Sequence, residues 1–207
     1  MKNMSISKRM TTFLEHNFYL INNNEARNYG IMYGKENNYE WTFVLDSNQY
    51  FTHKSYIDII SNINIESEYI VIPQKRLKDN NINNNDIISN DVAVVEDIIN
   101  NLPVQEPQIA FKNSSQYMFN PEIPYGLSPK AEILVALNVP GKWHKWIHGS
   151  YFKSLNITPR KFNDCKFQTL SQVIRLHPHN DNNDISKNYI LRWEGIYLLA
   201  KKIQESL

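Results

Sequence analysis

The stretch YIVIP, residues 69–73, decides how the first part of this chain is expected to fold. Four consecutive apolar residues, three of them β-branched, are typical of a buried strand. The proline at 73 predicts the end of that strand, because proline donates no ladder hydrogen bond. Just upstream, residues 53–63 (HKSYIDIISNI) carry four apolar side chains at helical spacing. A helix followed by a buried strand is therefore predicted.

Further upstream the pattern favours short strands. Residues 29–34 (YGIMYG) and 40–45 (EWTFVL) are rich in aromatic and β-branched residues, with a polar turn between them, and 49–52 form a short third candidate. Residues 7–21 have the apolar spacing of an opening helix. The expected order is helix, two or three strands, helix, strand. This order predicts a small layer of helices on an antiparallel sheet.

The rest of the chain reads differently. Residues 78–108 contain the Asn-rich run KDNNINNND and the proline-rich run LPVQEPQ around one short candidate helix. Helices are expected from Pro129, over 142–155 and over 189–205. We therefore expect three parts: an α+β sheet domain (1–77), a connector (78–108) and a helical basic region (109–207). The predicted fold class is α+β, with a small antiparallel sheet layer in the N-terminal half and a mostly helical, basic C-terminal half.

Charge is distributed unevenly along the 207 residues. Residues 1–123 hold 10 Lys and Arg against 15 Asp and Glu, whereas 124–207 hold 12 against 6. Such asymmetry is a hint of a polyanionic partner for the basic half, although attraction between the halves would also explain it. The single cysteine, Cys165, allows no internal disulfide. With no signal peptide and no long apolar run, a cytoplasmic protein without membrane contact is expected.

One segment of the basic half predicts a helix-turn-helix. Trp143, Ile147, Tyr151 and Leu155 recur every four residues, giving a first helix one apolar stripe. Thr158 followed by proline is typical of the start of a second helix. The stretch LNITPRKF, residues 155–162, resembles the turn of bacterial helix-turn-helix regulators, with asparagine where glycine is usual. The alternative is a pair of core helices with a solvated polar face.

The resemblance implies DNA binding through the polar face of the second helix, where cations contact phosphate and glutamine reads adenine. Lysines and aromatic residues of the preceding helix are suited to backbone contacts or to stacking on unpaired bases. We therefore expect nucleic acid as the partner, no cofactor, and the acidic half serving dimerisation, sensing or a second activity. The candidate nucleic-acid-binding residues are Lys142, Lys145, Lys153, Arg160, Lys161, Gln168 and Arg175.

Two other functions stay open. A Mg²⁺-dependent nuclease would need paired acids and a nearby lysine, and Asp46 at a strand end is one candidate acid. A protein-interaction module, such as an inhibitor or immunity protein, would need no catalytic residues at all.

Four histidines have spacings found in metal sites. His177 and His179 lie in an H-x-H-x-D pattern that resembles the metallo-β-lactamase site, but asparagine occupies the next usual ligand position. His144 and His148 have metalloprotease spacing but no adjacent glutamate. We expect no bound metal, although the sequence does not decide whether these four side chains converge in space.

Overall fold

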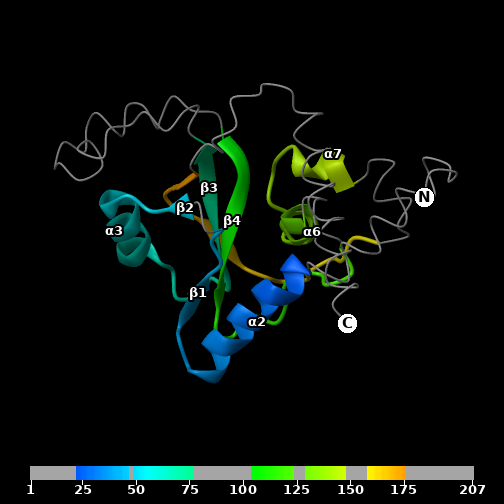
Figure 1. Ribbon diagram of the computed structural model, residues 1–207, viewed down its shortest axis with the longest axis horizontal. Helices are drawn as coiled ribbons and strands as arrows, with labels where there is room; N and C mark the ends of the chain where they lie inside the picture. The colour runs from blue at the N-terminus through cyan, green and yellow to red at the C-terminus, as the bar shows by residue number, and fades with distance from the viewer. Residues whose placement is uncertain (1–21, 47–48, 77–103, 124–128, 148–157, 176–207) are drawn as a thin grey trace, which may run out of the picture.

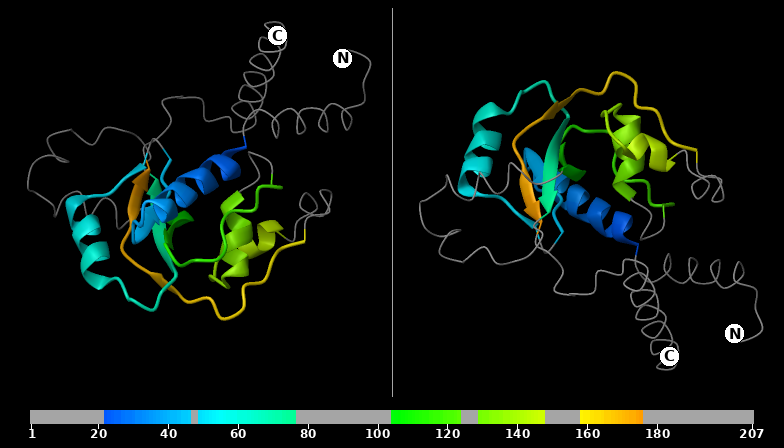
Figure 2. Two further views of the ribbon diagram at one scale, coloured as in Figure 1. Left: turned by 90° about the horizontal axis from the view of Figure 1, so that it is seen from below. Right: turned by 90° about the horizontal axis from the view of Figure 1, so that it is seen from above.

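A curled, six-stranded mixed sheet forms the centre of the molecule (Figures 1 and 2). The computed structural model describes residues 22–46, 49–76, 104–123, 129–147 and 158–175. Within them the strands are β1 (Trp41–Phe43), β2 (Gln49–Tyr50), β3 (Tyr69–Arg76), β4 (Val104–Lys112), β5 (Phe167–Thr169) and β6 (Val173–Arg175). The helices are α2 (Asn23–Glu36), α3 (His53–Asn62), α6 (Pro129–Ala136) and α7 (Trp143–Ile147).

Strand β3 is the centre of the sheet. The strand order is β1-β4-β3-β6-β2, and β5 also pairs with β3. On one edge β3 is antiparallel to β4, with Val71 opposite Ile109. On the other edge it is parallel to β5 along its first half and to β6 along its second half, where Gln74 lies opposite Val173. Strand β3 therefore pairs with two strands, β5 and β6, that lie more than 90 residues later in the sequence.

The two faces of β3 bury two separate cores. Tyr69 and Val71 pack with side chains of α2, α6 and α7 on one face. Ile70 and Ile72 pack with Ile59 of α3 on the other. Figure 2 shows the sheet between α3 and the other helices. This alternation is the period of two that a strand buried on both faces requires.

Several predicted elements are confirmed. The strands expected at 40–45, 49–52 and 69–72 correspond to β1, β2 and β3, and the helices expected over 53–63 and from Pro129 correspond to α3 and α6. Pro73 does not end its strand as predicted, because β3 continues to Arg76. The register with β4 shifts between Ile72 and Gln74, and a proline is tolerated at such an irregularity.

The strand predicted over 29–34 is wrong, because these residues lie within α2. The helix begins at Asn22, whose side chain accepts a hydrogen bond from the Glu25 amide. Ile31, on α2, is completely buried in the core, and Gly34 allows the helix to lie close to Thr42 of β1. Capping and packing therefore outweigh the strand preference of the aromatic residues.

The predicted fold class is also wrong. A mixed, curled sheet replaces the small antiparallel layer, and the C-terminal half is not mostly helical where the structure describes it. The second helix expected from Thr158 is not formed, since residues 158–166 are irregular and β5 and β6 follow. Pairing with β3 buries Val173 and Ile174 completely, and this tertiary contact decides the local structure.

Other predictions concern parts of the chain outside the described residues. These are the helices over 7–21 and 189–205, the short helix within 78–108, and the end of the helix over 142–155, of which α7 is the described part. Residues 104–108, assigned to the connector, begin β4. The division into three parts stays a prediction. In the described ranges, no helix has the length and apolar character needed to cross a membrane.

Two glycines of α2 make a matched pair for testing how this helix packs. A Cβ atom at Gly34 would lie 2.0 Å from the Thr42 hydroxyl, whereas a Cβ at Gly30 would meet nothing within 4 Å. We expect Gly30→Ala to raise the free energy of unfolding by about 1 kcal/mol through helix propensity. Gly34→Ala should lower it by roughly 1–3 kcal/mol through overpacking. Denaturant unfolding checks both, and equal effects would contradict this packing of α2 on β1.

Candidate functional site

Two acidic residues lie at adjacent strand ends. Asp46 follows β1, and Glu106 lies near the start of β4. The two strands are antiparallel with Phe43 opposite Ala110, so the chain after β1 runs toward the start of β4. The charges of Asp46 and Glu106 interact, and Asp46 contributes to the raised pKa of Glu106. The strand pairing therefore creates a pair of carboxylates that are 60 residues apart in sequence.

Three cationic side chains from three other elements surround this pair. Arg27 of α2 donates a hydrogen bond to one oxygen of Asp46 at 3.0 Å, and Arg175 of β6 lies 3.8 Å from the other oxygen. Lys130, at the start of α6, is only 4% exposed. The five ionisable groups carry three positive and two negative formal charges, so the cluster has a net charge of about +1.

The surroundings shift the pKa values of Glu106, Asp46 and Lys130 in different ways. Burial raises the pKa of Glu106, and the nearby Lys130 only partly opposes this. Burial alone would also raise the pKa of Asp46, but Lys130, Arg27 and Arg175 together hold it below its usual value. Burial lowers the pKa of Lys130 to about 8. Groups with perturbed pKa values that share one location are typical of functional sites.

A chain of glutamine side chains connects Lys130 to Asp46. The Lys130 ammonium donates to Gln108 Oε1 at 2.8 Å, and Gln108 Nε2 donates to Gln74 Oε1 at 2.8 Å. Gln49 also donates to Gln74 Oε1, and its own Oε1 accepts from the Asp46 backbone amide at 2.7 Å. Because Gln74 and Gln108 are only 2% exposed, this network fixes the lysine and the aspartate relative to each other.

Two buried polar atoms of the cluster have no hydrogen-bond partner among the described residues. They are Glu106 Oε1 and Arg175 Nε, an acceptor and a donor. Buried polar atoms are nearly always satisfied in native proteins, and an unsatisfied one is costly. Both atoms therefore keep a hydrogen-bonding capacity that no described residue uses.

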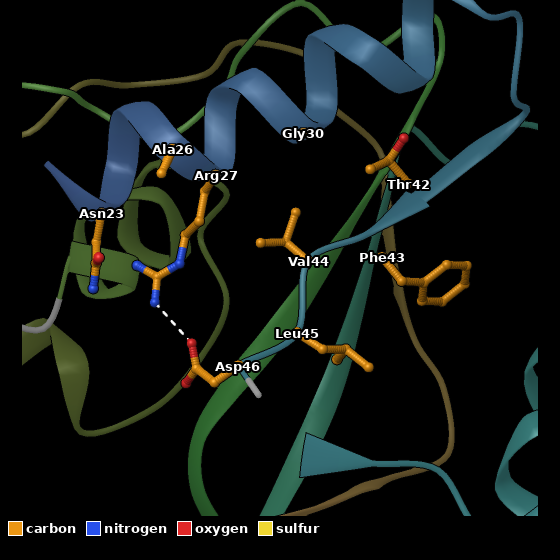
Figure 3. A pocket seen from close by; sticks show the side chains of 9 residues that line it. All are labelled: Asn23, Ala26, Arg27, Gly30, Thr42, Phe43, Val44, Leu45 and Asp46. Carbon is orange, nitrogen blue, oxygen red and sulfur yellow. Dashed lines mark hydrogen bonds and ion pairs between the residues drawn. The ribbon is translucent and has the colours of Figure 1, made fainter. Parts of the chain in front are cut away.

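A cavity of about 370 Å³ adjoins the cluster between α2 and β1 (Figure 3). The Arg27–Asp46 ion pair closes one end of it. Val44 projects toward the helix in the middle, whereas Phe43 and Leu45 point to the other side of the strand. The cavity wall therefore alternates along the strand, with Thr42, Val44 and Asp46 facing α2.

The structure separates most of the residues predicted to bind nucleic acid. Lys142, Lys145 and Lys161 are exposed, and Lys153 lies outside the described residues. Gln168 is committed to the fold, because its side-chain oxygen accepts from the Asn64 amide at 2.9 Å. Arg175 alone among the predicted residues belongs to the charged cluster.

Arg160 is committed to the fold as well. Its guanidinium donates twice to the carboxylate of Glu132, each time at 2.8 Å, and Glu132 is completely buried. The backbone amide of Arg160 also donates to the Glu132 carboxylate, and the guanidinium donates to the Met118 carbonyl. This ion pair ties the irregular segment before β5 to α6, so Arg160 has a structural role.

The other predicted chemistry does not gather at this site. His144 Nε2 lies 2.9 Å from the Val139 carbonyl, and the remaining three candidate histidines lie outside the described residues. Asp164 and Lys166 have the acid-x-lysine spacing found in nucleases, but they lie in the irregular segment before β5, where Lys166 forms an exposed ion pair with Glu66. In the ranges that are described, no three His, Cys, Asp or Glu side chains form a metal-binding group.

Sequence reasoning identified Asp46 and Arg175 but missed Arg27, Glu106, Gln108 and Lys130. The available signal was the pattern E-P-Q before the apolar run IAF, because residues 106 and 108 are polar beside a strand that is otherwise buried. The prolines of this stretch favoured a connector instead. No described protein family, curated protein or solved structure matches this chain.

The half-buried Glu106 and the fully buried Glu132 allow the cluster to be distinguished from a purely structural ion pair. Folding costs energy while Glu106 is charged, because its pKa is raised, and this cost disappears as the pH falls through that raised pKa. Glu106→Gln should therefore leave the free energy of unfolding equal or higher at neutral pH, with the difference shrinking in acid. Glu132→Gln should lower it by about 1–3 kcal/mol, since Arg160 loses its charged acceptor.

Chemical denaturation across a pH series measures both variants. A large destabilisation by Glu106→Gln at neutral pH, similar to that of Glu132→Gln, would contradict this description. It would mean that Glu106 serves the fold in the same way as Glu132.

Proposed function

We propose that this protein is a nucleic-acid-binding enzyme that hydrolyses phosphodiester bonds with Mg²⁺ at Asp46 and Glu106. The observation that carries the proposal is the meeting of two carboxylates, a buried lysine and two arginines, of which Asp46 and Arg27 also line a cavity. Acids for a metal ion and cations for phosphate are the groups that this chemistry needs. A purely structural ion pair would not require an unsatisfied buried carboxylate oxygen.

Two carboxylates are enough for the metal in question. Mg²⁺ retains several waters and is commonly held by one or two carboxylates together with the phosphate of the substrate. Asp46 and Glu106 would supply those two, and Glu106 Oε1 is free of hydrogen bonds within the described residues. A bound Mg²⁺ supplies a Lewis acid for the phosphate and lowers the pKa of a coordinated water.

The reaction is a hydrolysis that balances without a further reactant. The oxygen of water forms a bond to phosphorus, and the bond from phosphorus to the bridging sugar oxygen breaks. The departing oxygen keeps the electron pair and takes up a proton, while the attacking water loses one. Lys130, whose ammonium group is held by Gln108, would supply a positive charge that offsets the negative charge developing on the phosphate.

The arginines would have a different role in the free and bound states. In the free protein Arg27 and Arg175 occupy both oxygens of Asp46. If Asp46 held Mg²⁺, each guanidinium would be free to donate to a phosphate oxygen, which arginine binds well. The net positive cluster therefore suits a substrate whose backbone is anionic.

Exposed cations elsewhere support a polymeric substrate. Lys142, Lys145 and Lys161 are exposed, and Lys142 lies 5.8 Å from the centre of the half-exposed Trp146 ring. Cations beside an exposed aromatic ring suit a nucleic-acid backbone and its bases. The lone cysteine, Cys165, supports a reducing, cytoplasmic setting for such an enzyme.

Cleavage of labelled oligonucleotides is the direct test. With Mg²⁺ present, the full chain should cut single-stranded or duplex DNA or RNA, and chelation should abolish the cutting. Asp46→Asn and Glu106→Gln should each reduce the rate by at least about a hundredfold. Glu66→Gln is the matched control, because this glutamate forms an exposed ion pair far from the cluster and should leave the rate unchanged.

Equal activity of the wild type and Glu106→Gln would contradict the proposal. Binding without any cleavage under all metal conditions would leave a nucleic-acid binder. Neither binding nor cleavage would favour a protein-interaction module.

A further inference from the structure

The cavity beside the charged cluster has the features of a subsite for one nucleotide. It lies between α2 and β1, and the Arg27–Asp46 ion pair closes one end (Figure 3). Its volume of about 370 Å³ is within the range of small-molecule sites. Val44 and Ala26 offer apolar contact, and Asn23 and Thr42 offer hydrogen-bonding groups. An apolar wall with a few polar groups and a cation at one end suits a base and sugar attached to phosphate.

Gly30 keeps this cavity open. It lies on the side of α2 that faces β1, and a Cβ atom placed there would meet nothing within 4 Å. A glycine inside a helix costs about 1 kcal/mol relative to alanine. The packing near Gly30 therefore does not require a glycine, unlike that near Gly34, and the open space beside it is the feature that a ligand would use.

Two exposed tyrosines stand on α2 next to the cavity. Tyr29 is 74% exposed and Tyr33 is 51% exposed. Residues three apart are neighbours on a helix surface, so Tyr29 lies beside Ala26 and Tyr33 beside Gly30. Large exposed aromatic residues one helical turn apart are a stacking platform for unpaired bases.

We propose that α2 and β1 form a binding site for single-stranded nucleic acid. One nucleotide occupies the cavity, and the neighbouring bases stack on Tyr29 and Tyr33. Bases in a duplex are already paired and stacked, so placing one in the cavity costs less energy for an unpaired strand. This inference rests on the proposed function for the position of the cleaved phosphate, but it concerns binding and is tested by binding alone.

The test uses the full chain with EDTA, so that no cleavage takes place. Fluorescence anisotropy with labelled single-stranded DNA, single-stranded RNA and duplex DNA should give tighter binding to a single strand than to the duplex. Gly30→Leu introduces a large side chain at the cavity wall, where a Cβ atom meets nothing within 4 Å, and should weaken single-strand binding by at least about fivefold, with duplex binding unchanged. Tyr29→Ala combined with Tyr33→Ala should weaken it similarly.

The control is Tyr56→Ala on α3, because Tyr56 is as exposed as Tyr33 but α3 packs on the opposite face of the sheet. Its single-strand affinity should equal that of the wild type, and thermal unfolding should show that Gly30→Leu remains folded. Unchanged affinity of folded Gly30→Leu would overturn the inference. A preference for duplex would overturn it as well. Either result could coexist with Mg²⁺-dependent cleavage, so the two proposals fail separately.

Discussion

Strand β3 is the constraint on which the rest of the structure depends. It is hydrogen-bonded along both edges, to β4 on one side and to β5 and β6 on the other. Its first four residues are almost completely buried and alternate between the two cores. Its second half turns polar, and Gln74 there is buried within the network that holds Lys130 and Asp46. One strand therefore supplies both the apolar centre of the fold and one wall of the charged cluster.

The cluster carries an energetic cost that the fold does not need. Lys130 is buried and Glu106 is half-buried, and loss of solvent shifts the pKa of each away from its ordinary value in the direction that disfavours charge. The ion pair of Arg160 with Glu132 is different, because its geometry is bidentate and its hydrogen bonds are satisfied. Proteins retain unfavourable buried charges mainly where function requires them. The contrast between Glu106 and Glu132 is the reason that we place the proposed site at Glu106 and not at Glu132.

How much of this could be predicted from the sequence depended on whether the deciding contacts were local. The strand at 69–72 and the helix at 53–62 were predictable from apolar spacing, and Thr52 caps that helix as its side chain allows. The aromatic composition of residues 29–34 predicts a strand. They form a helix because Asn22 caps its start and because Gly34 packs against β1, and the second of these contacts is not local. Residues 167–175 become strands only because β3 offers them an edge.

The site was predictable only in part for the same reason. Asp46 was identified as an acid at a strand end, and Arg175 as a cation, but Glu106 and Lys130 are brought to them by strand pairing and by α6.

The most direct test is diffraction from crystals grown with Mn²⁺ and a short oligonucleotide. The account predicts an anomalous peak bound by Asp46 and Glu106, with Arg27 moved from Asp46 to a phosphate. No peak there, with both arginines still on Asp46, would contradict it.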